Sequence, residues 1–494
     1  MKDFLIIPMG GKGKRFIKAG YKTYKPFLPV SKSSNIIDNI INNFSNKKIS
    51  VILIGNKKKI KRYKIKKQIK IINIKNHNKG PLYSIYLAKD KIKEIVKKNR
   101  IFICYSDINW KWNKNEIFNY LKKKKSVIFT HTGFHPHLEV DQKSDFCLLN
   151  RKKLINNIKQ KKTHFNDYKK EFLAIGCYFF QNFDLIYNDI NNFNYLRNKK
   201  KEFYLVSLIQ LLLKRKIPIF SKEIKKFVHL GNPQQYEDFL YWKKIVNIFL
   251  NSTINFKNKN NVMLMAGKGK RVKNLPEQKP FLKIRKEFAF EYILKKYGAK
   301  KNIIITNSKY FKRINNPKYV VNKINNTNSM FSTFLNSRKY LNNCKSFFLL
   351  SCDCFGSIDN KKFKLFLDQN NPDIVVFGFK FTNLQKNLFQ SHTELIIKRN
   401  FLLNINVKNS SSQSQIGHAG FFWLKNNDVF KNLENFKNFA KNNIKKREIL
   451  VDDYFSYLHK FNLMKVNYYP LDYYVHFGSL PEYYELQYWD NYFK

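Results

Sequence analysis

The chain has 494 residues, of which 43% are hydrophobic and 16% are aromatic, and its formal net charge is +60 at pH 7. This length is too great for one hydrophobic core, and the composition excludes an intrinsically disordered chain. The charge alone favours nucleic acid as a partner, but the basic residues are spread along the chain, so we expect no specific nucleic-acid partner. A diffuse positive field favours phosphate-bearing small substrates instead.

The first half of the chain alternates apolar runs with amphipathic stretches. Runs rich in β-branched residues predict buried strands at 4–7, 50–54, 101–105 and 126–130. Apolar residues at helical spacing predict helices at 36–44 and 82–96. This alternation is typical of an α/β fold with a mostly parallel, Rossmann-like sheet and helices on both faces.

The second half repeats this order. Its predicted strands lie at 262–265, 302–306, 347–351 and 374–379. The polar, Asn-rich stretch at 251–261 is interpreted as a linker. We therefore predict one domain at 1–250 and a second at 262–494.

A glycine-rich motif is written twice. Residues 10–15 (GGKGKR) precede KPF at 25–27, and residues 266–271 (AGKGKR) precede KPF at 279–281. Four more pairs of segments follow in the same order at a near-constant offset of about 250 residues. They are 82–87 with 330–335, 105–107 with 351–353, 175–179 with 419–423, and 227–233 with 474–480. Such a period predicts tandem duplication of a whole domain rather than a solenoid.

The glycines follow an apolar strand directly, which lets backbone amides approach phosphate. In the first half these are Gly10, Gly11 and Gly13, and in the second half Gly267 and Gly269. The spacing is not that of a P-loop, and it lacks the last glycine of the dinucleotide-binding pattern. A nucleoside triphosphate is therefore the expected ligand.

These motifs resemble the signature of the sugar-phosphate nucleotidyltransferases, the nucleoside-diphosphate-sugar pyrophosphorylases. The similarity runs through 9–30, 80–82, 106–107, 132–137, 202–208 and 231–233, and so covers nearly all of residues 1–245. The second half is similar to the same superfamily, and residues 326–330 resemble its phosphocholine cytidylyltransferase branch.

The resemblance implies a Mg²⁺-dependent reaction in which a phosphate oxygen of the acceptor attacks the α-phosphorus of an NTP and pyrophosphate leaves. It implies nucleotide-binding roles for Gly10, Gly11, Gly13, Gly80, Gly267, Gly269 and Asn328, and catalytic roles for Arg15, Lys25, Arg271 and Lys279. It further implies metal binding by Asp107 and Asp353, and sugar-phosphate binding by Lys161. The partners are then an NTP and a phosphorylated small molecule, and a homo-oligomer is expected because this family often assembles.

Some positions depart from the family pattern. His229 and His476 stand where many members carry a second metal aspartate, and histidine is a poor Mg²⁺ ligand. Either the metal is held by one aspartate and phosphate oxygens, or this late loop no longer binds metal. Gln160 stands where a glutamate usually precedes the sugar-phosphate lysine, and Asn328 replaces the glycine equivalent to Gly80.

Several functions stay open at this point. The leading hypothesis is an enzyme that makes NDP-sugars for surface polysaccharide or glycolipid synthesis. A phosphocholine-type cytidylyltransferase in the second half, a non-catalytic nucleotide sensor and a glycosyltransferase are alternatives, although the D-x-D motif of glycosyltransferases is lacking around Asp107 and Asp353. Asp452 and Asp453 could supply further carboxylates or lie in a solvated turn.

The compartment is predicted from cysteines and apolar runs. Of six cysteines only Cys352 and Cys354 are close together, and a single C-x-C pair is a weak metal signal, so we expect reduced thiols in the core. No apolar run approaches the roughly 18 residues of a membrane-spanning helix, and residues 1–8 are interpreted as a strand rather than a signal peptide. We expect a cytoplasmic protein without a membrane span.

Overall fold

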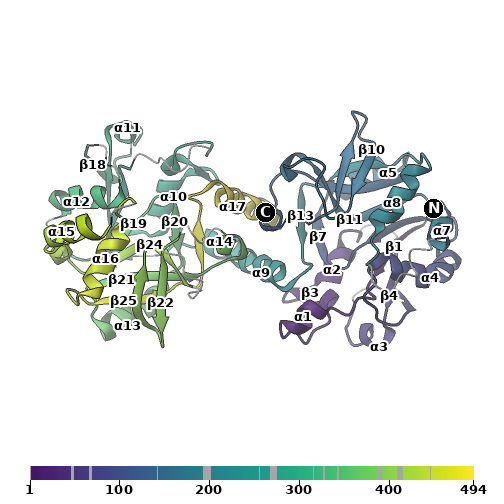
Figure 1. The fold of residues 1–494 in the computed structure, drawn as a ribbon, viewed down its shortest axis with the longest axis horizontal. Helices are drawn as coiled ribbons and strands as arrows, with labels where there is room; N and C mark the ends of the chain where they lie inside the picture. The colour runs from purple at the N-terminus through teal and green to yellow at the C-terminus, as the bar shows by residue number, and fades with distance from the viewer. Residues whose placement is uncertain are drawn as a thin grey trace. The chain divides into compact units, whose positions relative to one another are not determined.

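The computed structural model divides the chain into two compact domains, Met1–Trp242 and Lys243–Phe493, each with its own sheet (Figure 1). We call them the first and the second domain. The structure describes residues 2–45, 49–65, 69–141, 143–192, 202–254, 256–267, 275–314, 316–325, 327, 329–341, 344–387, 392–408, 416–444 and 447–494.

The first domain is built on a mixed sheet with a parallel centre. The strands are β1 (Asp3–Pro8), β2 (Pro29–Ser31), β3 (Ser34–Asn35), β4 (Ile49–Gly55), β5 (Ile69–Asn73), β6 (Arg100–Cys104), β7 (Ile108–Lys111), β8 (Ser126–His131), β9 (Phe146–Leu149), β10 (Ile155–Lys159), β11 (Phe172–Phe180), β12 (Phe220–Glu223) and β13 (Lys226–His229). The main sheet runs β10-β9-β11-β6-β1-β4-β5, with β8 and β12 beyond β11. Every residue of β1 is buried, because parallel strands lie on both of its sides.

The helices of the first domain cover this sheet. They are α1 (Lys14–Lys18), α2 (Ile36–Asn42), α3 (Lys57–Ile60), α4 (Pro81–Val96), α5 (Lys114–Leu121), α6 (Pro136–Val140), α7 (Asp184–Asn191), α8 (Leu205–Lys214) and α9 (Pro233–Asn247), whose residues from Lys243 onward belong to the second domain. The predicted helices at 36–44 and 82–96 are confirmed as α2 and α4. Helix α7 packs against both α4 and α8, and their apolar residues join those of the sheet in one core.

The second domain repeats the topology. Its strands are β14 (Phe256–Met265), β15 (Lys283–Ile284), β16 (Glu287–Phe288), β17 (Ala299–Thr306), β18 (Tyr319–Lys323), β19 (Phe347–Leu350), β20 (Cys354–Gly356), β21 (Ile374–Lys380), β22 (Glu394–Lys398), β23 (Phe401–Asn406), β24 (Ile416–Leu424), β25 (Val466–Pro470) and β26 (Tyr474–His476). The order β18-β17-β14-β19-β24-β21-β25 matches β5-β4-β1-β6-β11-β8-β12, and the β20–β26 ribbon matches β7–β13. The α/β class and the order of strands in both halves are therefore as predicted.

The helices of the second domain are α10 (Ala289–Lys296), α11 (Ser308–Phe311), α12 (Met330–Leu341), α13 (Asn360–Asn370), α14 (Asn383–Asn387), α15 (Leu433–Asn443), α16 (Val451–Lys460) and α17 (Leu480–Phe493). Helices α12, α15 and α16 pack together over the sheet. Among the described residues of both domains, no helix combines the length and the apolar character needed to cross a membrane.

The prediction of a linker at 251–261 is wrong for residues 256–261. From Phe256 onward these residues belong to β14, the central strand of the second sheet. The polar composition misled the prediction because amide side chains can pair with one another inside a sheet. Asn261 is fully buried and donates a hydrogen bond to Asn302 Oδ1 at 2.9 Å.

Candidate functional site

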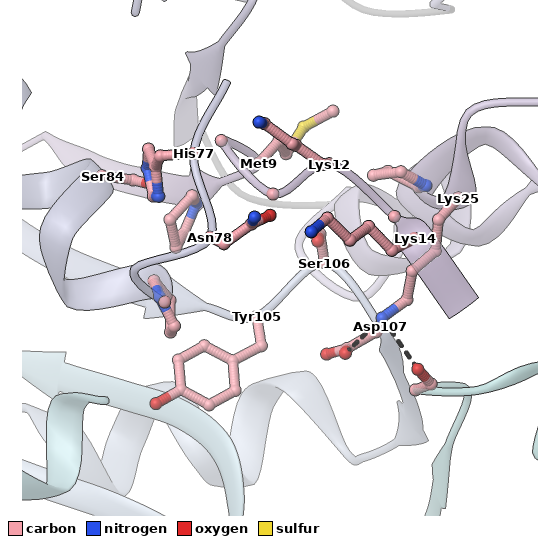
Figure 2. A pocket seen from close by; sticks show the side chains of 18 of the residues that line it. Met9, Lys12, Lys14, Lys25, His77, Asn78, Ser84, Tyr105, Ser106 and Asp107 are labelled. Atoms are coloured by element: carbon pink, nitrogen blue, oxygen red, sulfur yellow. Dashed lines mark hydrogen bonds and ion pairs between the residues drawn. The ribbon is translucent and has the colours of Figure 1, made fainter. Parts of the chain in front are cut away.

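The first domain contains a cavity of about 420 Å³ where β1 and β6 end. It is lined by residues 8–16, 24–26, 77–78, 80–81, 84, 105–107, 202, 204 and 231. Seven predicted site residues therefore meet around one space, namely Gly10, Gly11, Gly13, Arg15, Lys25, Gly80 and Asp107. Figure 2 shows Lys25 bridged to Asp107 at one end of the cavity and His77 beside Ser84 at the other.

The glycine loop connects β1 to α1, and its glycines meet different demands. A Cβ on Gly10 would lie 2.5 Å from His77 Nε2 and 2.6 Å from Ser84 Oγ, so a larger residue would require these side chains to move. A Cβ on Gly11 would meet nothing within 4 Å, because this residue faces open space. Gly13 has φ 68° and begins α1, a left-handed conformation that glycine adopts without strain. The loop thus leaves room for a ligand at Gly11.

Gly80 brings a second segment to the cavity. Its φ is 80°, and a Cβ here would lie 2.5 Å from the carbonyl oxygen of Phe203. It directly precedes α4, a helix of 16 residues whose first turn therefore borders the cavity. The N-terminus of such a helix carries a partial positive charge, which favours phosphate. Its first residue, Pro81, has no N–H, and the amide of Leu82 donates to the carbonyl oxygen of Phe203 at 3.1 Å.

Lys25 and Asp107 form the charged centre of this site. Lys25 Nζ lies 2.7 Å from Asp107 Oδ2 and also donates to the carbonyl oxygen of Gly231 at 3.2 Å. Burial alone would raise the pKa of the Asp107 carboxyl, but the charge of Lys25, with a smaller contribution from Arg15, lowers it below its ordinary value. The carboxylate is therefore ionised at neutral pH, and Arg15 itself is exposed.

The loop that begins at His229, which we call the late loop, contacts Asp107. Pairing of β13 with β7 places His229 opposite Ile108, and the amide of Leu230 donates to the carbonyl oxygen of Asp107 at 2.7 Å. Burial lowers the pKa of His229 to about 4 although Asp107 is close, so its imidazole is neutral at pH 7. Its ring centroid lies 5.6 Å from that of His135. The late loop of the first domain therefore brings no second carboxylate to this point.

Lys161 lies outside the residues that line the cavity. Its Nζ is 3.8 Å from Glu202 Oε2 and 4.8 Å from the centroid of the Tyr204 ring, and both of those residues do line the cavity. Its backbone N–H donates to Asp145 Oδ1 at 3.1 Å. Lys161 is thus one residue removed from the cavity wall.

Sequence reasoning missed several residues of the wall. Lys14 Nζ lies 3.2 Å from the side-chain amide oxygen of Asn78, on the cavity side of the glycine loop. His77 Nε2 lies 2.9 Å from Ser84 Oγ, and burial, followed by the charge of Lys79, lowers the pKa of His77 to about 4. Lys14 was detectable as a third basic residue in the motif. His77 carries no local signal, because its role depends on contact with Gly10.

The second domain holds an equivalent charged centre. Lys279 Nζ lies 2.7 Å from Asp353 Oδ2, and Ser351 Oγ donates to Asp353 Oδ1 at 2.5 Å. Burial would raise the pKa of Asp353, but the charge of Lys279 holds it well below its ordinary value. A Cβ on Gly267 would meet nothing within 4 Å, as at Gly11. The predicted site residues Gly269, Arg271 and Asn328 lie outside the described residues.

A smaller cavity of about 150 Å³ adjoins Asp353. Asp452 lines it, with Oδ1 2.9 Å from His418 Nδ1 and Oδ2 accepting from Thr393 Oγ1 at 2.9 Å. Asp453 instead lies in the first turn of α16 and accepts a hydrogen bond from Arg447 at 2.7 Å. Neither aspartate lies in a solvated turn, so that alternative is wrong. The Cys354 thiol is buried and donates to a backbone carbonyl, as expected for a core cysteine.

Comparison with known proteins finds one matching family model and several similar solved structures. Residues 5–241 match the profile of the family described as nucleotidyl transferase. A comparison with curated proteins finds no match.

Among solved structures, the chain is similar to a nucleoside-diphosphate-sugar pyrophosphorylase from Vibrio cholerae RC9, at 17% identity over 48% of this chain and 99% of that one, with a TM-score of 0.39. It is also similar to an inositol-1-phosphate CTP transferase from T. maritima, at 17% identity over 48% and 96%, with a TM-score of 0.38. A third is the CTP:phosphocholine cytidylyltransferase from Streptococcus pneumoniae, at 16% identity over 48% and 97%, with a TM-score of 0.38.

The family match spans the domain that carries the glycine loop, Lys25 and Asp107 around one cavity. The first domain of this chain is therefore similar along nearly its whole length to the nucleotidyl transferase family.

Proposed function

We propose that the first domain joins an NTP and a sugar phosphate to give an NDP-sugar and pyrophosphate, in a reaction that depends on Mg²⁺. The observation that carries this proposal is the ion pair of Lys25 and Asp107, 2.7 Å apart, at a cavity that the glycine loop also lines. A cavity of about 420 Å³ is of the size that holds a small-molecule ligand. The family match of residues 5–241 supports the reaction type.

The glycine loop and the start of α4 would bind the triphosphate. Gly11 faces open space, so its backbone can approach phosphate oxygens closely. The first turn of α4, after Gly80, offers the positive end of the helix dipole. Arg15, Lys14 and Lys25 would neutralise the charge that builds up on the leaving pyrophosphate.

The donors at this site fit Mg²⁺ held by one protein carboxylate. Asp107 is ionised, and its side chain keeps 30% of its surface exposed. Mg²⁺ takes oxygen ligands and is commonly bound by one or two carboxylates together with phosphates and water. Asp107 would hold the ion, whereas the neutral imidazole of His229 does not suit it. When bound, the ion would supply positive charge that polarises the α-phosphoryl group and stabilises the leaving oxygen.

The chemical step depends mainly on the alignment of the acceptor phosphate with the α-phosphorus of the NTP. A phosphate oxygen of the acceptor forms a bond to the α-phosphorus, the bond from that phosphorus to the bridging oxygen of the β-phosphate breaks, and its electron pair leaves with pyrophosphate. No proton has to be removed from an ionised acceptor phosphate. Lys25 and Arg15 would contribute by holding the charged groups in line.

We propose the same chemistry for the second domain, because Lys279 and Asp353 repeat the pair at the same distance. The products would serve surface polysaccharide or glycolipid synthesis, a role supported by the resemblance of the motifs alone. Phosphocholine is the acceptor to compare with sugar phosphates, because residues 326–330 resemble cytidylyltransferases.

The test is release of pyrophosphate by the full chain with Mg²⁺, measured for each NTP and dTTP against sugar 1-phosphates and phosphocholine. Release that requires one NTP and one acceptor is the expected result, and Asp107→Asn together with Asp353→Asn should abolish it. Lys143→Ala serves as the control, because Lys143 is an exposed lysine away from the cavity. Saturable NTP binding without release by any pair would contradict the proposal and favour a nucleotide sensor.

A further inference from the structure

Three metal-ligating side chains converge beside Asp353 in the second domain. His392 precedes β22, His476 ends β26, and Glu482 lies in the first turn of α17. One ligand atom from each lies within 4.8 Å of the others. Their side chains are 5%, 18% and 1% exposed. Within the described part of the chain, this is the one such group of three.

The Glu482 carboxylate lies between the two imidazoles. His392 Nε2 is 3.2 Å from Oε1, and His476 Nδ1 is 2.7 Å from Oε2. Tetrahedral ligands with bonds of about 2.0–2.2 Å lie roughly 3.3 Å from one another. His476 Nδ1 is buried and makes no directed hydrogen bond within the described residues, although the carboxylate is so close. One carboxylate thus contacts both imidazoles, and the three ligand atoms lie close enough together to bind a single ion.

The surroundings hold these ligands in place. Ser479 Oγ donates to Glu482 Oε2 at 2.5 Å, a contact of the kind that orients a ligating carboxylate. Aromatic rings of Phe379 and Phe381 stand edge-on to the His392 ring, with centroids 5.7 and 5.6 Å away. Both histidines also line the cavity of about 150 Å³, which leaves space for a further ligand beside them.

The first domain has the same scaffold without the carboxylate. His229 matches His476, and six residues further on Gln235 stands where the second domain has Glu482. Gln235 Oε1 accepts from the amide of Gly231 at 2.9 Å, and a neutral amide is a weak metal ligand. A second imidazole is still present, because the rings of His135 and His229 lie 5.6 Å apart.

We propose that His392, His476 and Glu482 form a binding site for a divalent transition metal of the Zn²⁺ type in the second domain. Two imidazoles and one carboxylate suit Zn²⁺ and related ions, whereas Mg²⁺ prefers oxygen ligands alone. Three protein ligands with a position left open are typical of reactive rather than structural zinc. The proposed NTP reaction does not use these side chains. A test of the metal site is therefore independent of a test of that reaction.

The test uses the full chain without a polyhistidine tag, incubated with ZnCl₂ and dialysed. Elemental analysis is expected to find one equivalent of zinc, and Co²⁺ in its place should give the intense visible bands of a four-coordinate site. Glu482→Gln, which installs the side chain of the matching first-domain position, should weaken Zn²⁺ binding by at least about 100-fold, since loss of even an outer partner costs 10- to 100-fold. His229→Ala, at the first-domain position that matches His476, should leave zinc content unchanged.

Two results would overturn the site. One is a full chain that retains no zinc after dialysis, and the other is a folded Glu482→Gln variant that binds Zn²⁺ as tightly as the original chain. Circular dichroism checks that the variant folds. If it does not, the Co²⁺ spectrum of the unmodified chain decides, because the weak bands of an octahedral all-oxygen complex would exclude the two imidazoles.

Discussion

In the first domain Lys25 Nζ lies 2.7 Å from Asp107, and in the second Lys279 Nζ lies 2.7 Å from Asp353. In both domains an amide of the late loop donates to the backbone carbonyl of the aspartate, at 2.7 Å from Leu230 and 3.0 Å from Phe477. The charged centre is thus kept. The residues that surround this ion pair differ between the two domains.

The late histidines show this difference most clearly. Burial lowers the pKa of His229 to about 4, its ring lies beside that of His135, and the position that matches Glu482 holds the uncharged Gln235. For His476, burial would also lower the pKa, but the Glu482 carboxylate outweighs it and raises the pKa above its ordinary value. The amide at one position and the carboxylate at the other therefore go with opposite pKa shifts of the histidine beside the central aspartate.

The largest expected effect separates the two domains as enzymes. Asp107→Asn should lower Mg²⁺-dependent pyrophosphate release by at least about 100-fold if the first domain carries the activity, because the metal loses its charged ligand and Lys25 its partner. Asp353→Asn in the same assay reports on the second domain. Equal rates for both variants and the unmodified chain at limiting Mg²⁺ would contradict the assignment of both aspartates.

A substitution that creates a metal site in the first domain would test the difference between the two late loops directly. Gln235→Glu should create in the first domain, with His135 and His229, a counterpart of the group formed by Glu482. Zn²⁺ affinity there should rise by at least about 10-fold, because a charged oxygen replaces a neutral one. Zinc content of the Gln235→Glu chain, compared with that of the unmodified chain, is the measurement. An unchanged content would show that the carboxylate is not what distinguishes the two late loops.

A substitution at Gly10 tests how closely the glycine loop packs against its neighbours. Gly10→Ala should destabilise the first domain by roughly 1–3 kcal/mol, because the added methyl group would lie 2.5 Å from His77 Nε2. The second domain already has Ala266 at this position, with Thr327 in the place of His77. The double variant Gly10→Ala/His77→Thr should therefore regain much of the loss in denaturant unfolding. No difference between the single and double variants would rule out this clash.

The smallest expected effect is one of pH. Burial raises the pKa of Asp145 to about 6, so the folded state favours the protonated carboxyl, and stability falls as the pH rises from about 4 to 6. The second domain has the uncharged Thr393 at the matching backbone position. Asp145→Asn should be more stable than the unmodified chain at pH 8 by on the order of 1–2 kcal/mol, and equal to it near pH 4. Unfolding curves at the two pH values measure this, and a constant difference would contradict it.

The sequence predicted much of the fold and most of the charged centre. Residues 4–7, 50–54 and 101–105 are short, apolar and β-branched, and all are central strands. Gly11, Lys25 and Asp107 were found because they belong to compact motifs that occur twice. The error at 251–261 arose because amide side chains of β14 pair inside the sheet, which no local pattern reveals.

By itself, the sequence determined that two α/β domains of one topology follow each other and that each places a lysine and an aspartate after matching segments. Local pattern suffices for this, because hydrophobic periodicity and short motifs depend on neighbouring residues. Only the tertiary structure decided that His77 packs against Gly10 and that His392 meets Glu482, 90 residues further on. Such contacts depend on how strands and loops distant in the chain are brought together, and composition and spacing do not record that.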